Sequence, residues 1–215
     1  MKKFIGILLL PIFLVSFSTA EIQNNKRLSN GSPLNIPTKI DTTGARQFWD
    51  ALSKHCGKAF EGKIVSAPAG DDFRDKRLVM HVLSCSTDKI LIPFNVGDDR
   101  SRTWVLTLKN GIIELKHDHR HADGASDKIT MYGGSTSNSG LPTLAMFPAD
   151  EETATMIPAA ATNVWWITIN ENVFTYNLRR IGTDRFFSVS FDLTTEIETP
   201  EASWGWEDYT HPTKE

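Results

Sequence analysis

The sequence predicts a mainly β fold, an antiparallel up-and-down β-barrel with one short N-terminal helix. Beyond residue 57, apolar residues alternate with polar ones at a period of two, which is typical of strands with one buried face. Turn sequences such as Asn110-Gly111 and Gly133-Gly134 separate about ten such runs by hairpin-length connections. A barrel is favoured over an open sandwich because a closed sheet leaves no unpaired edge strand.

The helix is expected immediately before the first strand. Its apolar residues recur at helical spacing, and they are Ala45, Phe48, Trp49 and Leu52. Asp41, Thr42 or Thr43 can cap its N-terminus, and Gly57 is expected to end it. The predicted strands are 58–65, 76–85, 89–96, 102–109, 112–119, 127–132, 142–147, 153–157, 163–170, 173–180 and 185–193.

The chain is expected to divide into four parts, and residues 1–20 read as a signal peptide. Lys2 and Lys3 precede an apolar stretch of about 14 residues, and small residues suited to a signal peptidase follow at 18–20. A bilayer span needs roughly 20 apolar residues, so an uncleaved membrane anchor is the less favoured alternative. The other parts are a flexible leader at 21–43, the β-barrel domain at 44–197 and an acidic, tryptophan-containing tail at 198–215. The protein is therefore predicted to be secreted or periplasmic.

Charge and hydropathy exclude two classes of partner. Loss of the two leader lysines changes the net charge from −3 to about −5, and the acidic chain has no basic cluster. Nucleic acid is therefore not expected as a partner, because phosphate neutralisation needs grouped Lys and Arg. After residue 20 no stretch is long and apolar enough to span a membrane, so no transmembrane segment is expected after signal cleavage.

The two cysteines, Cys56 and Cys85, are predicted to form a disulfide. An oxidising compartment favours pairing. If strand 58–65 pairs antiparallel with strand 76–85, the start of one strand lies beside the end of the other, which brings the two cysteines together. Two buried free thiols are the alternative.

The most informative stretch is a hairpin at 102–121 with three histidines near its end. A two-residue type I′ turn at Asn110-Gly111 fixes the register. The resulting cross-strand pairs share the core face, and they are Leu108–Ile113, Leu106–Leu115, Trp104–His117 and Arg102–His119. The opposite face carries Lys116 and Asp118 among other polar residues and is expected to be mostly solvated.

These side chains are predicted to form a small-ligand site at the mouth of the barrel. The candidate ligand-binding residues are His117, His119, His121, Arg102 and Trp104. His117 and His119 lie at i and i+2 on one face, so both can reach one metal ion, with His121, Asp123 or Asp127 completing its shell. In the alternatives, the histidines cap the strand end by bonding to loop backbone, or the strand ends at Asp118 and the rest is an exposed loop.

A helix with Phe48 and Trp49 that leads into hairpin-linked strands resembles the calycin-type barrel, the group that includes lipocalins and nitrobindin-like haem proteins. The stretches KHDHRHADGASDKITMYGG (116–134) and RRIGTDRFFSVSFDLT (179–194) are also similar to an uncharacterised family of secreted bacterial proteins. Ala59-Phe60-Glu61-Gly62 stands where lipocalins have Gly-x-Trp. The resemblance implies a calycin-like fold, and haem held by a strand histidine as a cofactor beside the divalent metal considered above.

Three functions are consistent with these features. The first is a secreted or periplasmic barrel that binds a small-molecule ligand. The second is a metal- or histidine-dependent enzyme that uses the same cluster, with Asp118 or Asp123 nearby. The third is a surface protein whose tail, with Trp204 and Trp206, meets a partner, although such tryptophans more often dock on their own domain. The chain has no G-x-S-x-G, P-loop, H-E-x-x-H or G-x-G-x-x-G motif.

Overall fold

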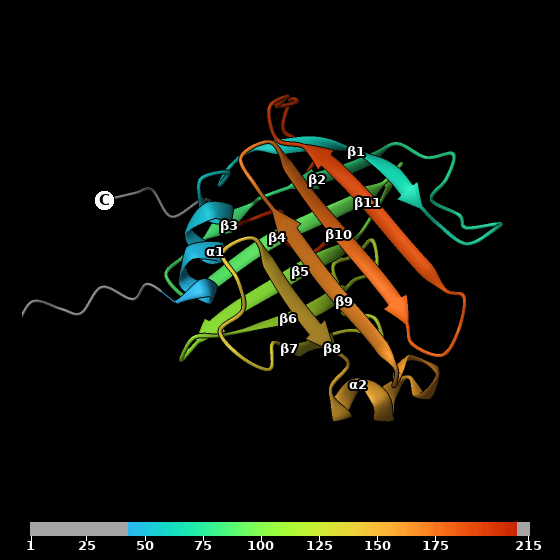
Figure 1. Ribbon diagram of the computed structural model, residues 1–215. Helices are drawn as coiled ribbons and strands as arrows, with labels where there is room; N and C mark the ends of the chain where they lie inside the picture. The colour runs from blue at the N-terminus through green and yellow to red at the C-terminus, as the bar shows by residue number, and fades with distance from the viewer. Residues whose placement is uncertain (1–42, 210–215) are drawn as a thin grey trace, which may run out of the picture. The chain divides into compact units, whose positions relative to one another are not determined.

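The computed structural model describes residues 43–209 and confirms the predicted fold class, a nearly closed antiparallel β-barrel (Figure 1). The strands are β1 (Ala59–Ser66), β2 (Leu78–His81), β3 (Ser84–Cys85), β4 (Lys89–Val96), β5 (Asp99–Lys109), β6 (Ile112–His119), β7 (Tyr132–Ser135), β8 (Leu144–Pro148), β9 (Asn163–Ile169), β10 (Val173–Arg180) and β11 (Phe186–Asp192). The helices are α1 (Gly44–Ser53), α2 (Glu151–Met156) and a 3-10 turn, η1 (Pro158–Ala160). The predicted signal peptide and nearly all of the predicted leader lie outside the described residues.

The strands follow one another around the barrel in chain order. The hydrogen-bonded path is β7-β6-β5-β4-β2-β1-β11-β10-β9-β8, and β3 extends the pairing of β4 beyond β2. Every neighbouring pair is antiparallel, and β1 pairs with β11, which joins the first strand to the last. The β5–β6 register is the predicted one, with Trp104 opposite His117 and Arg102 opposite His119. Both residues of its turn have positive φ, 53° at Asn110 and 76° at Gly111, as a type I′ turn requires.

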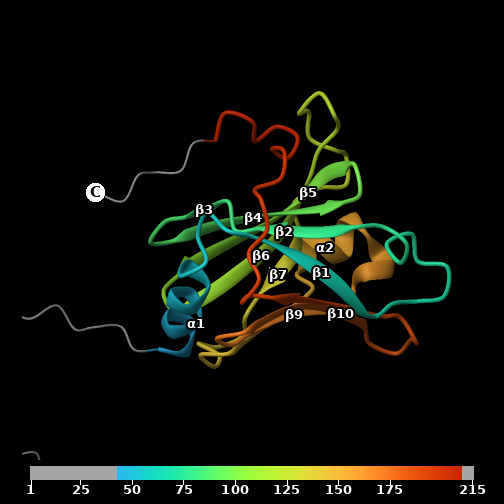
Figure 2. The same cartoon turned by 90° about the horizontal axis from the view of Figure 1, so that it is seen from above.

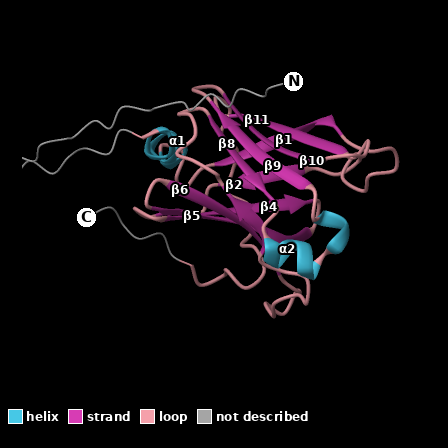
Figure 3. Cartoon of the chain, turned by 60° about the horizontal axis from the view of Figure 1, so that its bottom comes forward, coloured by secondary structure: helices cyan, strands magenta, loops and turns pink. Residues whose placement is uncertain are grey.

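Helix α1 closes one end of the barrel. Thr43 caps it, because its hydroxyl oxygen accepts a hydrogen bond from Arg46 N. Phe48, Trp49 and Leu52 are buried and belong to the same apolar core as the inward residues of the strands. Figure 3 shows α1 and α2 on opposite sides of the strands. The open end therefore lies toward α2.

Strands β7 and β8 follow each other in the chain but are not hydrogen-bonded, and α2 completes the seam between them. The outward N–H and C=O of Gly133 on β7 face no strand. Gly133 N donates to Thr153 Oγ1 (2.6 Å), and this hydroxyl donates back to Gly133 O (2.9 Å), which also accepts from Asp150 N (3.0 Å). A Cβ on Gly134 would lie 1.8 Å from Pro148 O, so only glycine allows this approach. The backbone N–H and C=O of Gly133 at the edge of the sheet are thus hydrogen-bonded to the N-terminal end of α2.

An ion-pair cluster reinforces the seam from outside. Lys116, 7 % exposed, places its Nζ 2.8 Å from Asp150 Oδ2 and 2.7 Å from Glu152 Oε2. Burial lowers the pKa of Lys116, but the hydrogen bonds and charges of the two carboxylates outweigh burial, and the pKa is raised. The lysine therefore stays charged and ties β6 to α2.

Two predicted strands are wrong. Residues 153–157 lie mostly in α2, because Asp150 caps the segment by accepting from Thr153 N and two glutamates in the first turn favour a helix. Most of 127–132 is loop, with Met131 at a φ of 57°, and only Tyr132 belongs to β7. The predicted strand 76–85 is interrupted and forms β2 and β3.

The outer face of the β5–β6 hairpin is not solvated, which corrects the expectation for Lys116 and Asp118. Lys116 is covered by α2, and Asp118 is 3 % exposed because the C-terminal segment crosses it. Trp206 Nε1 donates to Asp118 Oδ2 (3.1 Å), and the Arg120 guanidinium stacks over the Trp206 ring. Figure 2 shows this red segment running along the outside of the barrel beside β4 and β5. The tryptophans thus dock on their own domain.

The predicted disulfide is present. Cys56 follows α1, Cys85 ends β3, and their Cα atoms are 6.0 Å apart. The pairing of Ala59 with His81 on β1 and β2 brings them together, as the antiparallel arrangement predicts. Among residues 43–209, no helix has the length and apolarity to traverse a membrane.

We expect Thr153→Val to lower the free energy of unfolding by about 2–3 kcal/mol, because it leaves the Gly133 N–H buried without a partner. The matched control is Thr155→Val on the same helix, where the side chain is exposed and the change should stay within about 0.5 kcal/mol. Urea unfolding of both variants measures the difference. Equal losses would show that the hydroxyl does not stabilise the seam.

Reduction of the disulfide, or the double change Cys56→Ala and Cys85→Ala, should cost about 3–4 kcal/mol. The bridge closes a loop with a sequence separation of 29, and chain-entropy arguments give this magnitude for such a loop. Thermal unfolding with and without a thiol reductant measures it. A melting temperature that reductant leaves unchanged would contradict the prediction.

Candidate functional site

A cavity of about 520 Å³ lies in the barrel, between the β1–β2 loop and the segment that follows α2. Its size is in the range of small-molecule sites. Seven aromatic side chains line it, and they are Phe73, Phe94, Trp104, Tyr132, Trp165, Tyr176 and Phe187. The polar and charged lining consists of Asp71, Asp72, Arg102, Thr103, His117, His119, Asn163, Arg180 and Arg185. Four of the five predicted ligand-binding residues are therefore brought together: His117, His119, Arg102 and Trp104.

His117 is held in a single tautomer. Its Nδ1 lies 3.0 Å from Tyr132 O, and a carbonyl oxygen only accepts, so Nδ1 carries the proton. Its Nε2, 2.7 Å from Tyr176 Oη, then has the lone pair and accepts the Tyr176 hydroxyl proton. A buried imidazole thus orients a buried phenol.

The same surroundings keep His117 neutral. Burial lowers its pKa to about 3, and the charges of His119 and Lys116 act in the same direction, while the hydrogen bond to Tyr132 opposes them. The Tyr176 pKa is raised well above its ordinary value, chiefly by burial. Both partners are therefore uncharged at neutral pH, and their hydrogen bond is a neutral one.

A second tyrosine–histidine pair lies beside the first. Tyr132 Oη is 3.0 Å from His119 Nε2, and the Tyr132 ring stacks on His117 with centroids 4.8 Å apart. Burial raises the pKa of Tyr132 to about 12, and burial together with the charge of Arg102 lowers the pKa of His119. Tyr132 thus connects the two histidines, through its carbonyl to one and its hydroxyl to the other.

Trp104 forms the centre of an aromatic wall. Its ring stacks on Phe94 (4.8 Å between centroids) and on Tyr176 (4.3 Å), each within 15° of parallel. On the opposite side, Trp165 tilts over His117 at 5.1 Å. The cavity is therefore bounded by ring faces and edges, which favour flat or apolar groups.

The mouth is covered by the β1–β2 loop. Phe73 of this loop packs edge-on against Phe94 and Phe187, and the Arg102 guanidinium lies 5.1 Å from the centre of its ring. Arg102 is itself bound to Asp99 through a 2.6 Å contact. Burial raises the pKa of Asp99, but hydrogen bonds from Ser101 and Arg102 outweigh it, and the pKa is lowered. Arg102 thus holds the loop and is already paired with a carboxylate.

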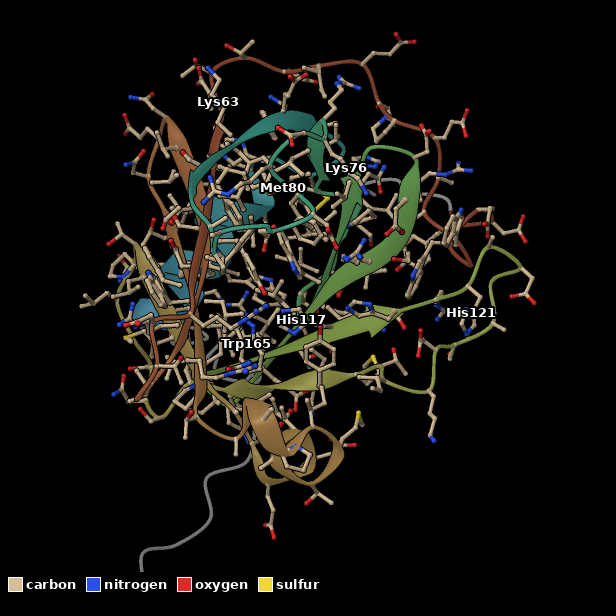
Figure 4. All side chains as sticks on the ribbon, turned by 90° about the vertical axis from the view of Figure 1, so that its right-hand side faces the viewer. Lys63, Lys76, Met80, His117, His121 and Trp165 are labelled. Carbon is tan, nitrogen blue, oxygen red and sulfur yellow. A yellow bond between two sulfur atoms is a disulfide. The ribbon has the colours of Figure 1, made fainter. Side chains whose placement is uncertain are left out.

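His121 does not lie in the cavity. Strand β6 ends at His119, so His121 is in the exposed loop that follows, where its backbone N–H donates to Ala125 O. In Figure 4, His117 and Trp165 lie together inside the barrel, and His121 lies out on the loop. The side chain of Asp123, offered as a metal ligand or acid–base partner, caps Ala125 N in the same loop.

The predicted metal site rests on His117 and His119. Within residues 43–209 no group of three or more His, Cys, Asp or Glu side chains gathers closely enough to hold a metal ion. Both Nε2 atoms are hydrogen-bonded to tyrosine, and a metal or haem iron at His117 Nε2 would have to displace the Tyr176 hydroxyl. The two histidines alone therefore do not fit a metal or haem centre as they stand.

Sequence reasoning missed several residues of this site. Trp165 and Tyr176 follow the core face of their strands, so their pattern predicts packing alone. The one available signal was the Tyr176 hydroxyl, since a phenol on a buried face needs a hydrogen-bond partner. Tyr132, Phe73 and Arg185 lie in loops or at strand ends, where periodicity carries no information.

Comparison with known proteins adds no relative, since no family model, curated protein or solved structure matches the chain. The fold and the site together define a nearly closed β-barrel with an aromatic cavity. The resemblance to calycin-type barrels stays a prediction.

Stability should fall as the pH falls from 7.5 to 5. His117 has a pKa of about 3 in the fold against about 6.5 in the unfolded chain, so the unfolded state takes up protons first. The stability that this difference contributes is complete above pH 6.5 and declines by about 2 kcal/mol by pH 5. Denaturant titrations across this range measure the slope, to which His119 adds in the same direction.

His117→Gln should remove most of this slope, even though the variant is less stable at pH 7.5. His121→Gln, at an exposed loop position outside the cavity, serves as the control and should keep the wild-type slope. A flat wild-type profile, or a slope that survives His117→Gln unchanged, would show that His117 is not buried as a neutral group.

Proposed function

We propose that the protein is a secreted or periplasmic barrel that binds a small-molecule ligand in this cavity. The single observation that carries the proposal is the cavity of about 520 Å³ with a largely aromatic wall and a few polar groups at fixed positions. Small-molecule sites typically have this composition, with apolar walls for affinity and few polar groups for orientation.

The polar groups support binding because they are pre-oriented. The Tyr132 carbonyl fixes the His117 tautomer, and His117 in turn fixes the direction in which Tyr176 donates. A ligand that meets these groups need not order them, which reduces the entropy lost on binding. The β1–β2 loop covers the mouth with Phe73 packed on Phe94 and Phe187, so a ligand that enters at this end has to displace the Phe73 side chain.

The export proposal rests on the lysine-led apolar stretch at 1–20 and on the disulfide. Disulfides persist in oxidising compartments and are rare in the cytosol. The Cys56–Cys85 bridge supports a secreted or periplasmic location for this reason. A ligand taken from outside the cytoplasm is then the natural partner.

Binding is preferred over the alternative of a metal- or histidine-dependent enzyme. A histidine that acts as a general base works best with a pKa near the ambient pH, and His117 has a pKa of about 3. Asp118, the carboxylate expected to assist, lies on the other face of β6, where Arg120 and Trp206 bind it. The cavity therefore suits the binding of a ligand by shape and hydrogen bonds better than catalysis by proton transfer.

The proposal is tested with N-phenyl-1-naphthylamine, an uncharged aromatic probe whose fluorescence rises in apolar sites. Leu178 lines the cavity, so Leu178→Trp should fill part of it and weaken probe binding at least about tenfold. The matched control is Arg179→Trp, which introduces the same side chain one residue further along β10, on the opposite face. It should bind the probe as the wild type does.

Circular dichroism and melting temperature confirm that both variants fold. If the wild type does not bind the probe, or Leu178→Trp binds it as well as Arg179→Trp does, the cavity is not a ligand site for apolar molecules and the proposal fails.

A further inference from the structure

We propose that the ligand is an aromatic acid whose anionic group is bound by Arg180 and Arg185, with its ring system against the aromatic wall. This inference rests on the proposed function and specifies the chemistry of its ligand. Its basis is a pair of arginines that line the cavity without a carboxylate partner among the described residues.

The two arginines are held side by side. Arg180 ends β10 and Arg185 immediately precedes β11, and Arg180 N donates to Arg185 O (3.1 Å) across the hairpin. Arg180 follows Leu178 on the inward face of β10, and its Nε donates to Asn163 Oδ1 (3.0 Å). Asn163 therefore fixes the guanidinium by its Nε and leaves the terminal nitrogens available. This is the arrangement that a planar anionic group such as a carboxylate meets well.

Four arginines of the described chain have no carboxylate within ion-pair distance, and of these four only Arg180 and Arg185 line the cavity. Five arginines of the described chain have a carboxylate within ion-pair distance, and they are Arg46, Arg77, Arg100, Arg102 and Arg120. In the same part of the chain, neither Arg180 nor Arg185 has one, although two aspartates line the same cavity. Of these, Asp71 accepts from Phe73 N and holds the lid. The positive charges of Arg180 and Arg185 are thus available to bind an anionic group of a ligand.

Arg180 and Arg185 line the same cavity as Tyr132 and Tyr176. Burial raises the pKa values of both tyrosines, and the positive charge of Arg185 opposes this effect. Arg180 is half-buried and Arg185 is solvent-exposed, so the attraction of an anion to Arg185 is screened by salt.

The rest of the lining favours aromatic rings. Phe94, Trp104 and Tyr176 form a continuous near-parallel stack, so a flat ring can extend or meet it. The cavity therefore matches a molecule with a rigid aromatic part and an acidic end.

The experiment compares two probes with the same aromatic skeleton. 1-Anilinonaphthalene-8-sulfonate is N-phenyl-1-naphthylamine with one added sulfonate, so the ratio of their dissociation constants isolates the anionic group. We expect the sulfonate to bind about tenfold more tightly at low salt and to lose this advantage at high salt, because Arg185 is solvent-exposed.

Arg180→Gln and Arg185→Gln should each reduce the advantage about threefold or more, and the double variant should abolish it. The matched control is Arg179→Gln, which removes the same charge from the same strand but on its outer face, and should leave the ratio unchanged. A ratio that Arg179→Gln lowers as much as Arg180→Gln would mean that only overall charge matters, and would overturn the inference.

The other outcomes separate this inference from the proposed function. If the uncharged probe binds in the wild type and is lost in Leu178→Trp, but the sulfonate has no advantage, the cavity is a ligand site and the acidic group is wrong. If neither probe binds, or both still bind the Leu178→Trp variant, the proposed function fails and the inference fails with it.

Discussion

The hydroxyl of Thr153 is the interaction on which the rest of the site depends. A barrel whose strands follow chain order needs one more ladder to close, and β7 and β8 do not form it. Thr153 takes the place of a strand by donating to and accepting from Gly133. Tyr132, the next residue, is thereby held with its carbonyl at His117 and its hydroxyl at His119. The hydrogen bonds inside the cavity are thus linked, through Gly133 and Tyr132, to the first turn of α2 outside it.

Burial decides the chemistry of the site more than any pair of charges does. Burial lowers the pKa of His117 and raises those of Tyr132 and Tyr176, because ionised forms are poorly solvated there. Charged side chains line the cavity where it meets solvent, and they are Asp71, Asp72, Arg102, Arg180 and Arg185. The inside of the barrel is therefore lined by neutral hydrogen-bonding groups and ring faces, and its rim carries the charged side chains.

The fold was largely predictable from the sequence because its strongest signals are local. Asn110-Gly111 fixes the β5–β6 register, and strand order then brings Cys56 to Cys85. Helix α2 was not predictable from periodicity, since six residues are too few to show it and only the Asp150 cap marks its start. The outer face of β6 was misjudged because polar residues on a strand look solvated until a distant segment covers them.

The candidate site was predictable only in part, for the same reason. The hairpin places His117, His119, Arg102 and Trp104 on one face without further information. Tyr176, the hydrogen-bond partner of His117 Nε2, lies on a strand about 60 residues away, and no local sequence pattern pairs the two residues. The loop that carries His121 leaves the sheet where the strand ends, and the sequence has no sharp stop signal at that point.

The segment after β11 has a consequence for how this chain matures. Ser203 Oγ hydrogen-bonds to Asn95 Oδ1 on β4, Trp204 N donates to Arg100 O on β5, and Trp206 reaches Asp118 on β6. Strand β1 pairs with β11, which lies nearly 130 residues later in the chain. When the chain emerges N-terminus first, from a ribosome or an export channel, strands β1, β4, β5 and β6 therefore lack these partners until residues 186–206 have emerged. Assembly of the barrel is a late event, and truncation near the end exposes sheet surface that the whole chain never shows.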